Sequence, residues 1–185
     1  MLVTGLPATG KSRLAAALQA RYRAPLLAKD DFKERLFDAL GTGGGIDAGS
    51  DRAAWSRQLS NASFALMFGQ LQALLPHVPL LLLEGNFRVD EHSPVVGAMA
   101  RNGGARVAQV LCLADESSRR QRLAARVADP LRHPGHGDTG RPVTATGSTD
   151  FLQLEGARWS FDSQQPWEPE VARLCAALDG WRDAD

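Results

Sequence analysis

GLPATGKS, the stretch from Gly5 to Ser12, fits the pattern G-x-x-x-x-G-K-[ST]. In this pattern a glycine-rich loop curls so that its backbone N–H groups point at phosphates. The pattern requires a strand before the loop and a helix after it. Residues 2–4 are apolar, and the residues from Arg13 onward, RLAAALQARY, are strong helix formers. The stretch therefore predicts a phosphate-binding loop, or P-loop, between the first strand and the first helix.

Each position of this loop has an expected role. Lys11 is expected to reach the β- and γ-phosphates of a nucleoside triphosphate, and the Ser12 hydroxyl to bind the magnesium ion that bridges them. The helix that begins at Lys11 adds its positive N-terminal end. The residues predicted to bind the nucleotide are Gly5, Leu6, Pro7, Ala8, Thr9, Gly10, Lys11, Ser12 and Arg13.

The composition fits a single globular domain, residues 1–185. The chain is 44% hydrophobic, and its 21 basic residues balance 21 acidic ones, which argues against a general binder of nucleic acids or membranes. Its apolar runs, such as Leu80 to Leu83, are far shorter than the roughly 20 residues that span a bilayer. Cys112 and Cys175 are expected to be buried thiols, which favours the cytoplasm. The sequence does not predict an oligomeric state.

Apolar stretches alternate with helical ones, which is typical of a parallel sheet covered by helices on both faces. Strands are predicted at residues 2–4, 25–28, 80–83, 107–113 and 158–162. Helices are predicted at residues 11–22, 31–40, 52–75, 94–101, 116–127 and 168–178. The Gly-rich stretch 41–51 and the stretch 130–149, rich in Pro, Gly, Thr and His, are predicted to be loops. Mobile loops around a phosphate site often form substrate lids.

Two adjacent acids, Asp30 and Asp31 in AKDDFKERL, stand where the second strand ends and a helix begins. The carboxyl ends of parallel strands share one edge of the sheet, so an acid there can face the γ-phosphate. Phosphoryl transfer to a hydroxyl needs a group that orients the acceptor oxygen and takes its proton. We expect Asp30 to be this base and Asp31 to cap the helix. The alternative is that both only cap the helix.

Glu84 follows the apolar run LLLL and is expected at the same edge of the sheet. There it can hold the magnesium ion or help to position the acceptor. The alternative is a solvated glutamate at an ordinary strand end. Arg88 is a candidate contact for an anionic substrate, although surface arginines are common.

Arg119, Arg122 and Arg126 recur at three- and four-residue spacing, which places them on one face of a helix. This face either contacts solvent or neutralises the charge that develops on a transferred phosphoryl group. Arg126 and Arg132, near the start of the 130–149 loop, are the best placed for the second role. The following HPGH lacks further ligands at zinc-binding spacing, so it predicts a proline-bent loop.

GLPATGKS, KDDFKERL, LLLEGNFR and the arginine-bearing helix that ends in RHPGH together resemble a group of AAA-type ATP-binding proteins. These are the small P-loop kinases related to zeta-toxin, chloramphenicol phosphotransferase and polynucleotide 5′-hydroxyl kinase. The resemblance covers residues 2 to about 138. It implies an α/β P-loop NTPase fold, a three-layer sandwich with a five-stranded parallel sheet ordered 2-3-1-4-5, and a mobile lid at about residues 116–149. It also implies ATP and magnesium as cofactors.

The resemblance implies roles for particular residues as well. Asp30 corresponds to the base, because an aromatic and a basic residue follow the acid pair. Lys33 corresponds to a basic residue that contacts the substrate. The lid arginine corresponds to Arg122 or Arg126, and the spacing does not decide between them. Residues 161–169 match only as part of a final strand and helix and would approach the adenine.

The predicted function is an ATP-dependent kinase that transfers the γ-phosphoryl group to a hydroxyl of a small molecule, such as an antibiotic, a sugar or a nucleoside. A polynucleotide or nucleotide-sugar kinase is the alternative among enzymes, and the zero net charge argues against a polynucleotide. A nucleotide-dependent switch or ATPase, with water as acceptor, is the alternative of another class. Phosphate contacts alone do not distinguish ATP from GTP.

Overall fold

The fold is built on one sheet of five parallel strands in the order β2-β3-β1-β4-β5, as expected. The computed structural model describes residues 1–41, 52–136 and 149–184. β1 lies in the middle of the sheet and pairs with β3 on one side and with β4 on the other. The strands are β1 Leu2–Thr4, β2 Leu26–Ala28, β3 Leu82–Glu84, β4 Ala108–Leu113 and β5 Ala157–Asp162.

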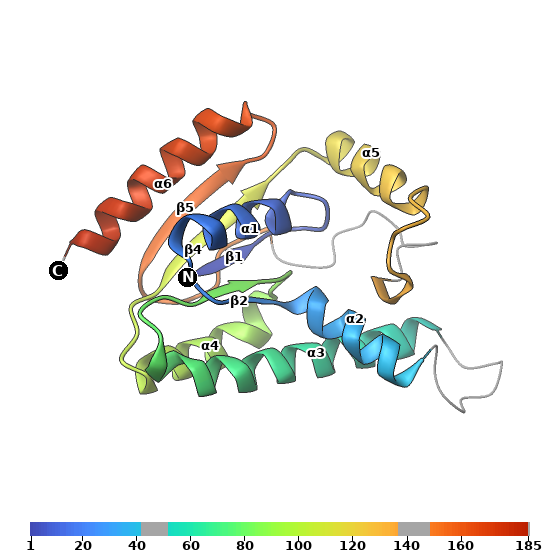
Figure 1. Cartoon of the computed structure of the whole chain (residues 1–185), viewed down its shortest axis with the longest axis horizontal. Helices are drawn as coiled ribbons and strands as arrows, with labels where there is room; N and C mark the ends of the chain where they lie inside the picture. The colour runs from blue at the N-terminus through green and yellow to red at the C-terminus, as the bar shows by residue number, and fades with distance from the viewer. Residues whose placement is uncertain (42–51, 137–148, 185) are drawn as a thin grey trace.

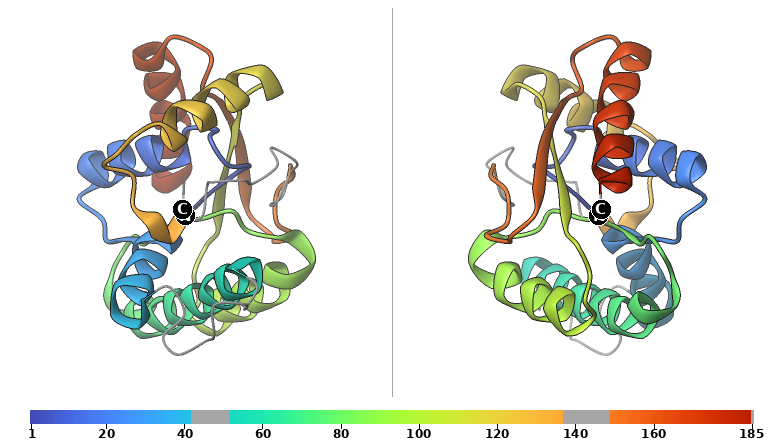
Figure 2. Two further views of the ribbon diagram at one scale, coloured as in Figure 1. Left: turned by 90° about the vertical axis from the view of Figure 1, so that its right-hand side faces the viewer. Right: turned by 90° about the vertical axis from the view of Figure 1, so that its left-hand side faces the viewer.

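Helices cover both faces of the sheet, so the molecule has three layers (Figure 1, Figure 2). α1 and α6 pack on one face, and α3 and α4 pack on the other. The helices are α1 Lys11–Tyr22, α2 Lys29–Leu40, α3 Arg52–Leu74, α4 Val89–Asn102, α5 Glu116–Val127 and α6 Trp167–Asp183, with the short 3-10 turns η1 Leu75–His77 and η2 Pro134–His136.

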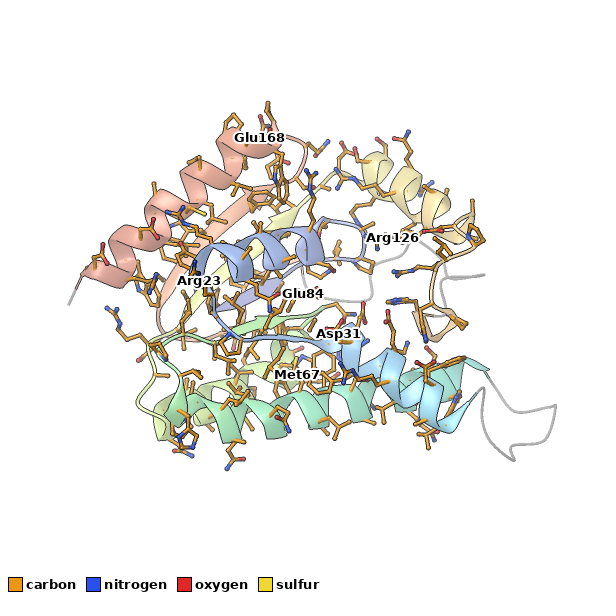
Figure 3. The ribbon with its side chains drawn as sticks, viewed as in Figure 1. Arg23, Asp31, Met67, Glu84, Arg126 and Glu168 are labelled. Atoms are coloured by element: carbon orange, nitrogen blue, oxygen red, sulfur yellow. The ribbon has the colours of Figure 1, made fainter. Side chains whose placement is uncertain are left out.

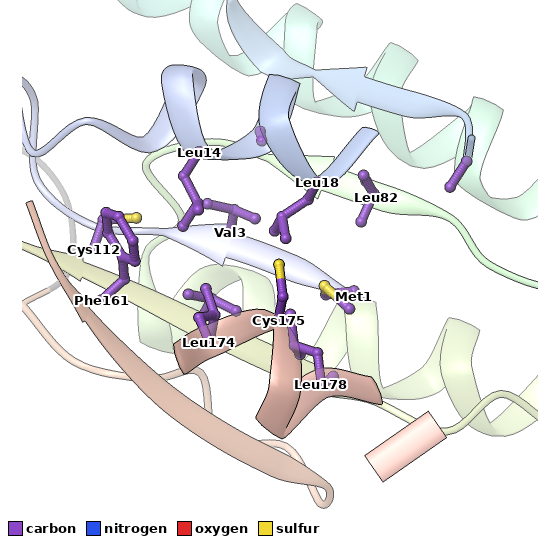
Figure 4. Close-up of a cluster of buried hydrophobic side chains, with 14 residues drawn as sticks. Met1, Val3, Leu14, Leu18, Leu82, Cys112, Phe161, Leu174, Cys175 and Leu178 are labelled. Atoms are coloured by element: carbon purple, nitrogen blue, oxygen red, sulfur yellow. The ribbon is translucent and has the colours of Figure 1, made fainter. Parts of the chain in front are cut away.

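Alternation along the strands divides the apolar side chains between two cores. Val3 and Leu82 belong to the core under α1 and α6, which Figure 4 shows. Leu2 and Leu83, one position away in the same strands, belong to the core under α3 and α4. Cys112 and Cys175 are free and buried, and both lie in the first core, as predicted.

Helix α2 begins earlier than predicted. It starts at Lys29, directly after β2, with Ala28 in the N-cap position and no side-chain cap. The prediction that Asp31 caps this helix is therefore wrong. Asp30 and Asp31 both lie inside the first turn, where negative charge interacts favourably with the helix dipole.

Two other helices are longer than predicted. α4 begins at Val89, not at Pro94, and the backbone N–H of Arg88, in the N-cap position, donates to His92 Nδ1 (2.8 Å). α6 continues through Gly180 to Asp183, and Trp181 in this extension packs edge-on against Trp159 of β5 (6.2 Å between centroids).

Residues 42–51 of the Gly-rich loop expected at 41–51, and residues 137–148 of the expected lid, fall outside the described ranges. In the ranges that the structure does describe, no helix combines the length and apolar character needed to cross a membrane.

His92 is a neutral base enclosed by aromatic rings, and this makes stability depend on pH. Its side chain packs against Phe64, Phe68 and Phe87. Burial, helped by the charge of Arg88, lowers the pKa of His92 to about 4. Between this value and the unfolded value of about 6.5, the unfolded chain binds a proton that the folded chain does not. Neutral His92 therefore favours the folded state fully above pH 6.5, and this contribution is lost as the pH falls toward 4.

We predict that the wild type loses about 2 kcal/mol more unfolding free energy between pH 7 and pH 4 than His92→Gln, whose amide cannot titrate. Urea unfolding of both proteins across this pH range measures the difference, in which the titrations that the two proteins share cancel. Equal losses in the two proteins would contradict a neutral, buried His92.

Candidate active site

The P-loop between β1 and α1 follows a path that requires glycine. Gly5 has φ 140° and Gly10 has φ 89°. A Cβ on residue 5 would lie 2.4 Å from the carbonyl oxygen of Cys112 in β4, closer than any side chain tolerates. The loop can therefore turn directly over the carboxyl edge of the sheet, and α1 begins there with Lys11.

Two arginines of α5 hold the outer side of the P-loop. Arg119 Nε donates to the Pro7 carbonyl oxygen and Arg122 Nη1 to that of Ala8, both at 3.1 Å. Arg122 also donates to the hydroxyl (2.8 Å) and the carbonyl oxygen (3.1 Å) of Ser163, which follows β5. Because a trans peptide points its C=O and N–H in opposite directions, these bonds turn the next N–H groups away from α5. The sequence did not predict the contact of Arg119 with Pro7. Its three-residue spacing from Arg122, which places both side chains on one face of α5, is the signal that could have indicated it.

Lys11, Ser12 and Glu84 meet beneath the loop. Lys11 is buried and its Nζ donates to the Leu6 carbonyl oxygen (3.0 Å), while Ser12 Oγ donates to Glu84 Oε2 (3.5 Å). Burial raises the pKa of Glu84 to about 7, against the opposing charge of Lys11. Burial also lowers the pKa of Lys11, and Glu84 opposes that shift. A hydroxyl and a carboxylate oxygen are the hard ligands that Mg²⁺ prefers, so Ser12 and Glu84 fit this ion.

Asp30 faces the same edge from the first turn of α2, with its side chain 45% exposed. Lys29 Nζ lies 3.0 Å from Asp30 Oδ1. Burial opposes ionisation of Asp30, but the charge and hydrogen bond of Lys29, with the charges of His136 and Lys11, lower its pKa to about 2. Asp30 is therefore ionised at every physiological pH. Lys29 was not among the predicted site residues, and its place next to the acid pair is the only signal of this role in the sequence.

The other arginines of the α5 segment also lie near ionisable groups of the site. Arg126 is close enough to Lys11 for its positive charge to lower the pKa of Lys11. Arg132 acts in the same way on the pKa of His136. Figure 3 shows Arg126 and Glu84, from α5 and β3, at the end of α1 that begins with Lys11.

Three further residues predicted for the site have their contacts elsewhere. Lys33 is buried between α2 and α3 and donates to Ser56 Oγ (2.9 Å). Arg88 pairs with Glu91 in α4 and donates to Asn61 Oδ1 of α3 (3.5 Å), so these contacts are not with the P-loop. Arg13 stacks on Trp167 at the start of α6, with 3.7 Å between its guanidinium carbon and the ring centroid. The predicted nucleotide-binding residue Arg13 is thus held by the final strand–helix unit.

The AAA domain family matches residues 1–137 of this chain. A solved structure from Chloroflexus aurantiacus, described as a "putative kinase", is 31% identical and superposes with a TM-score of 0.84, covering 97% of this chain and 96% of that one.

Two other solved structures share the fold at lower identity. A gluconokinase from Sinorhizobium meliloti 1021 has 16% identity and a TM-score of 0.51, and covers 97% of this chain and 94% of its own. TT1252 from Thermus thermophilus has 20% identity and a TM-score of 0.51, with 97% and 95% covered. No curated protein matches the chain. The family match and the 31% identical structure agree with the P-loop and the sheet order. This chain therefore belongs to the AAA domain family of P-loop proteins.

Proposed function

We propose that this protein is an ATP-dependent kinase that transfers the γ-phosphoryl group to a hydroxyl of a small molecule. The observation that carries the proposal is the position of Asp30, an ionised carboxylate at the carboxyl end of β2. Asp30 and Lys11 of the P-loop are close enough for each to shift the pKa of the other. A hydroxyl that approaches the γ-phosphate beside Lys11 therefore meets an oxygen that can accept its hydrogen bond.

In this proposal each residue has one task. The P-loop N–H groups and Lys11 bind the β- and γ-phosphates, and Ser12 and Glu84 hold the magnesium ion. When bound, that ion offsets the negative charge of the phosphates. Asp30 orients the acceptor hydroxyl in line with the γ-phosphorus and polarises its O–H bond. Arg126 stabilises the charge on the phosphoryl group in transit.

The acceptor is proposed to lie on the α2 side of the P-loop, next to Asp30. Lys33 of α2 and Arg88, which precedes α4, are proposed to contact an acceptor that carries an anionic group. Two structural neighbours support a kinase, since one is described as a "putative kinase" and another as a gluconokinase. We propose ATP as donor and the cytoplasm as location, and the zero net charge favours a small acceptor over a polynucleotide.

The proposal is tested by ADP release from magnesium-ATP across a panel of hydroxyl compounds, namely gluconate and other sugars, nucleosides, antibiotics, nucleotide sugars and 5′-hydroxyl oligonucleotides. We predict that at least one small molecule raises turnover and that Asp30→Asn lowers the stimulated kcat by about 10²- to 10⁴-fold, because the neutral amide lacks the negative charge that orients and polarises the acceptor hydroxyl. The matched control is Asp31→Asn, an exposed neighbour outside the proposed machinery, which should stay within about threefold of the wild type. Rapid ADP release that neither the panel compounds nor Asp30→Asn changes would instead indicate a nucleotide-dependent switch.

The two lid arginines should give different kinetic losses. Arg126→Ala should lower kcat by about 100-fold or more with little change in the KM for ATP, because the charge it supplies matters most during transfer. Arg122→Ala should instead raise the KM for ATP and lower the unfolding free energy by about 1–2 kcal/mol, because it removes the bonds to Ala8 and Ser163. Steady-state kinetics and urea unfolding of both variants measure these effects. The reverse pattern would make Arg122 the arginine that stabilises the transferred group.

A further inference from the structure

The turn η2 and the residue before it place two histidines, His136 and His133, against α2, a helix about one hundred residues earlier in the chain. His133 Nε2 lies 2.9 Å from Asp38 Oδ1, and His136 Nε2 lies 2.5 Å from Glu34 Oε1. The ring of His133 also packs edge-on against Phe37 (5.6 Å between centroids). These contacts fix η2 to the helix that carries Asp30.

The hydrogen bonds of His136 determine which ring nitrogen carries a hydrogen. The Glu34 carboxylate only accepts, so His136 Nε2 must donate to it, and the neutral ring then has its lone pair on Nδ1. This Nδ1 lies 3.7 Å from Asp30 Oδ2, which is too far for a direct hydrogen bond. The imidazole is therefore oriented by Glu34 and presents an unprotonated nitrogen beside Asp30.

Opposing charges surround this imidazole. Asp30, Asp31 and Glu34 of α2 favour its protonation, whereas Arg132, which precedes η2, opposes it. Burial is the largest effect, and the pKa of His136 lies below its ordinary value. The ring is thus neutral near pH 7 and able to accept a proton.

One hydroxyl oxygen can contact Asp30 and His136 at the same time. Two acceptor atoms 3.7 Å apart can both lie about 2.8 Å from one oxygen, the usual O–H···O and O–H···N distance. A hydroxyl placed there can donate its hydrogen to either atom. Its oxygen keeps its lone pairs for attack on phosphorus.

We propose that the acceptor hydroxyl binds in contact with both Asp30 Oδ2 and His136 Nδ1, and that His136 is a further catalytic residue, which receives the hydroxyl proton; this inference rests on the proposed kinase function. The O–H bond breaks as the proton moves to Nδ1. The hydroxyl oxygen forms a bond to the γ-phosphorus, and the bond from that phosphorus to the β,γ-bridging oxygen breaks and releases ADP. The imidazolium lies between the carboxylates of Asp30 and Glu34 until it returns the proton to solvent.

The two acids and the histidine then have complementary roles. A carboxylate with a pKa of about 2 binds a proton weakly, so Asp30 is suited to orient and polarise the hydroxyl. An imidazole is a stronger base, and the carboxylate of Glu34 behind it stabilises the imidazolium that forms. Because η2 carries His136, the base is complete only while η2 is docked on α2.

The first test is the protonation state of His136 in the intact protein without nucleotide. Ring-nitrogen NMR of protein labelled with ¹⁵N-histidine gives the tautomer directly, and the signals missing from His136→Gln assign this ring. We expect a neutral ring protonated at Nε2 at pH 7. A ring protonated at Nδ1, or an imidazolium at pH 7, would overturn the proposal.

The second test compares His136→Gln with the parallel variant His133→Gln, using magnesium-ATP and the panel compound that gives the highest turnover. The glutamine at 136 can still donate to Glu34, so docking of η2 is retained, but it cannot take a proton. We expect kcat to fall by about 10- to 100-fold with the KM for ATP unchanged, whereas His133→Gln stays within about threefold of the wild type. The ratio of wild-type to His136→Gln activity should decrease as the pH falls below the pKa of His136, because protonated His136 cannot accept the hydroxyl proton. Titrations shared by both proteins, such as that of Glu84, cancel in this ratio.

Equal losses in the two histidine variants, or a ratio that does not change with pH, would mean that His136 only docks η2 and would overturn its catalytic role. Failure of this inference is distinct from failure of the proposed function. Acceptor-dependent turnover that is lost in Asp30→Asn but retained in His136→Gln overturns the role of His136 alone. If no acceptor raises turnover and Asp30→Asn has no effect, the kinase function and this inference fall together.

Discussion

The site depends on a glycine at position 5, where no side chain fits. With φ at 140° and the Cys112 carbonyl oxygen where a Cβ would clash with it, Gly5 lets the chain leave β1 and turn immediately over the edge of the sheet. The N-terminal end of α1 then lies at the same edge as Glu84 and Asp30. A longer detour would move Lys11 and Ser12 away from both carboxylates. The distance from Ser12 to Glu84 thus follows from a backbone path that only glycine can take.

Charge at this edge is balanced before any phosphate arrives. Lys11 and Lys29 are nearly buried cations, and each lies near a carboxylate, which reduces the cost of burying them. The two acids respond differently, because Glu84 is almost fully enclosed and half-exposed Asp30 has a lysine at hydrogen-bond distance. The pKa of Glu84 rises to about 7 while that of Asp30 falls to about 2. Two carboxylates on one edge therefore acquire different chemical properties from their surroundings.

Local sequence patterns predict the strands and helices that position the site. They do not predict contacts between segments that are far apart in the sequence. The P-loop pattern fixed α1 correctly, and apolar runs located all five strands to within about two residues. Asp is a good capping residue, so Asp31 is predicted to be a cap, yet α2 starts two residues earlier, directly after the strand. Pro94 is predicted to begin α4, yet the helix begins five residues before it, at Val89. The contact of His136 with Glu34 spans 102 positions, and HPGH predicts only a bent loop.

The last strand and helix show why the site is not confined to the part of the chain that the family match covers. β5 extends the sheet through six paired positions with β4, and this brings Ser163 against Gly10 and Arg122. Arg122 therefore bonds at once to the P-loop and to the end of β5, while Trp167 of α6 stacks on Arg13 of α1. These contacts tie the outer side of the loop to residues beyond 137, where the family match ends. The shape of the phosphate site thus depends on packing from the C-terminal segment, although the P-loop, Asp30 and Glu84 come from the N-terminal half.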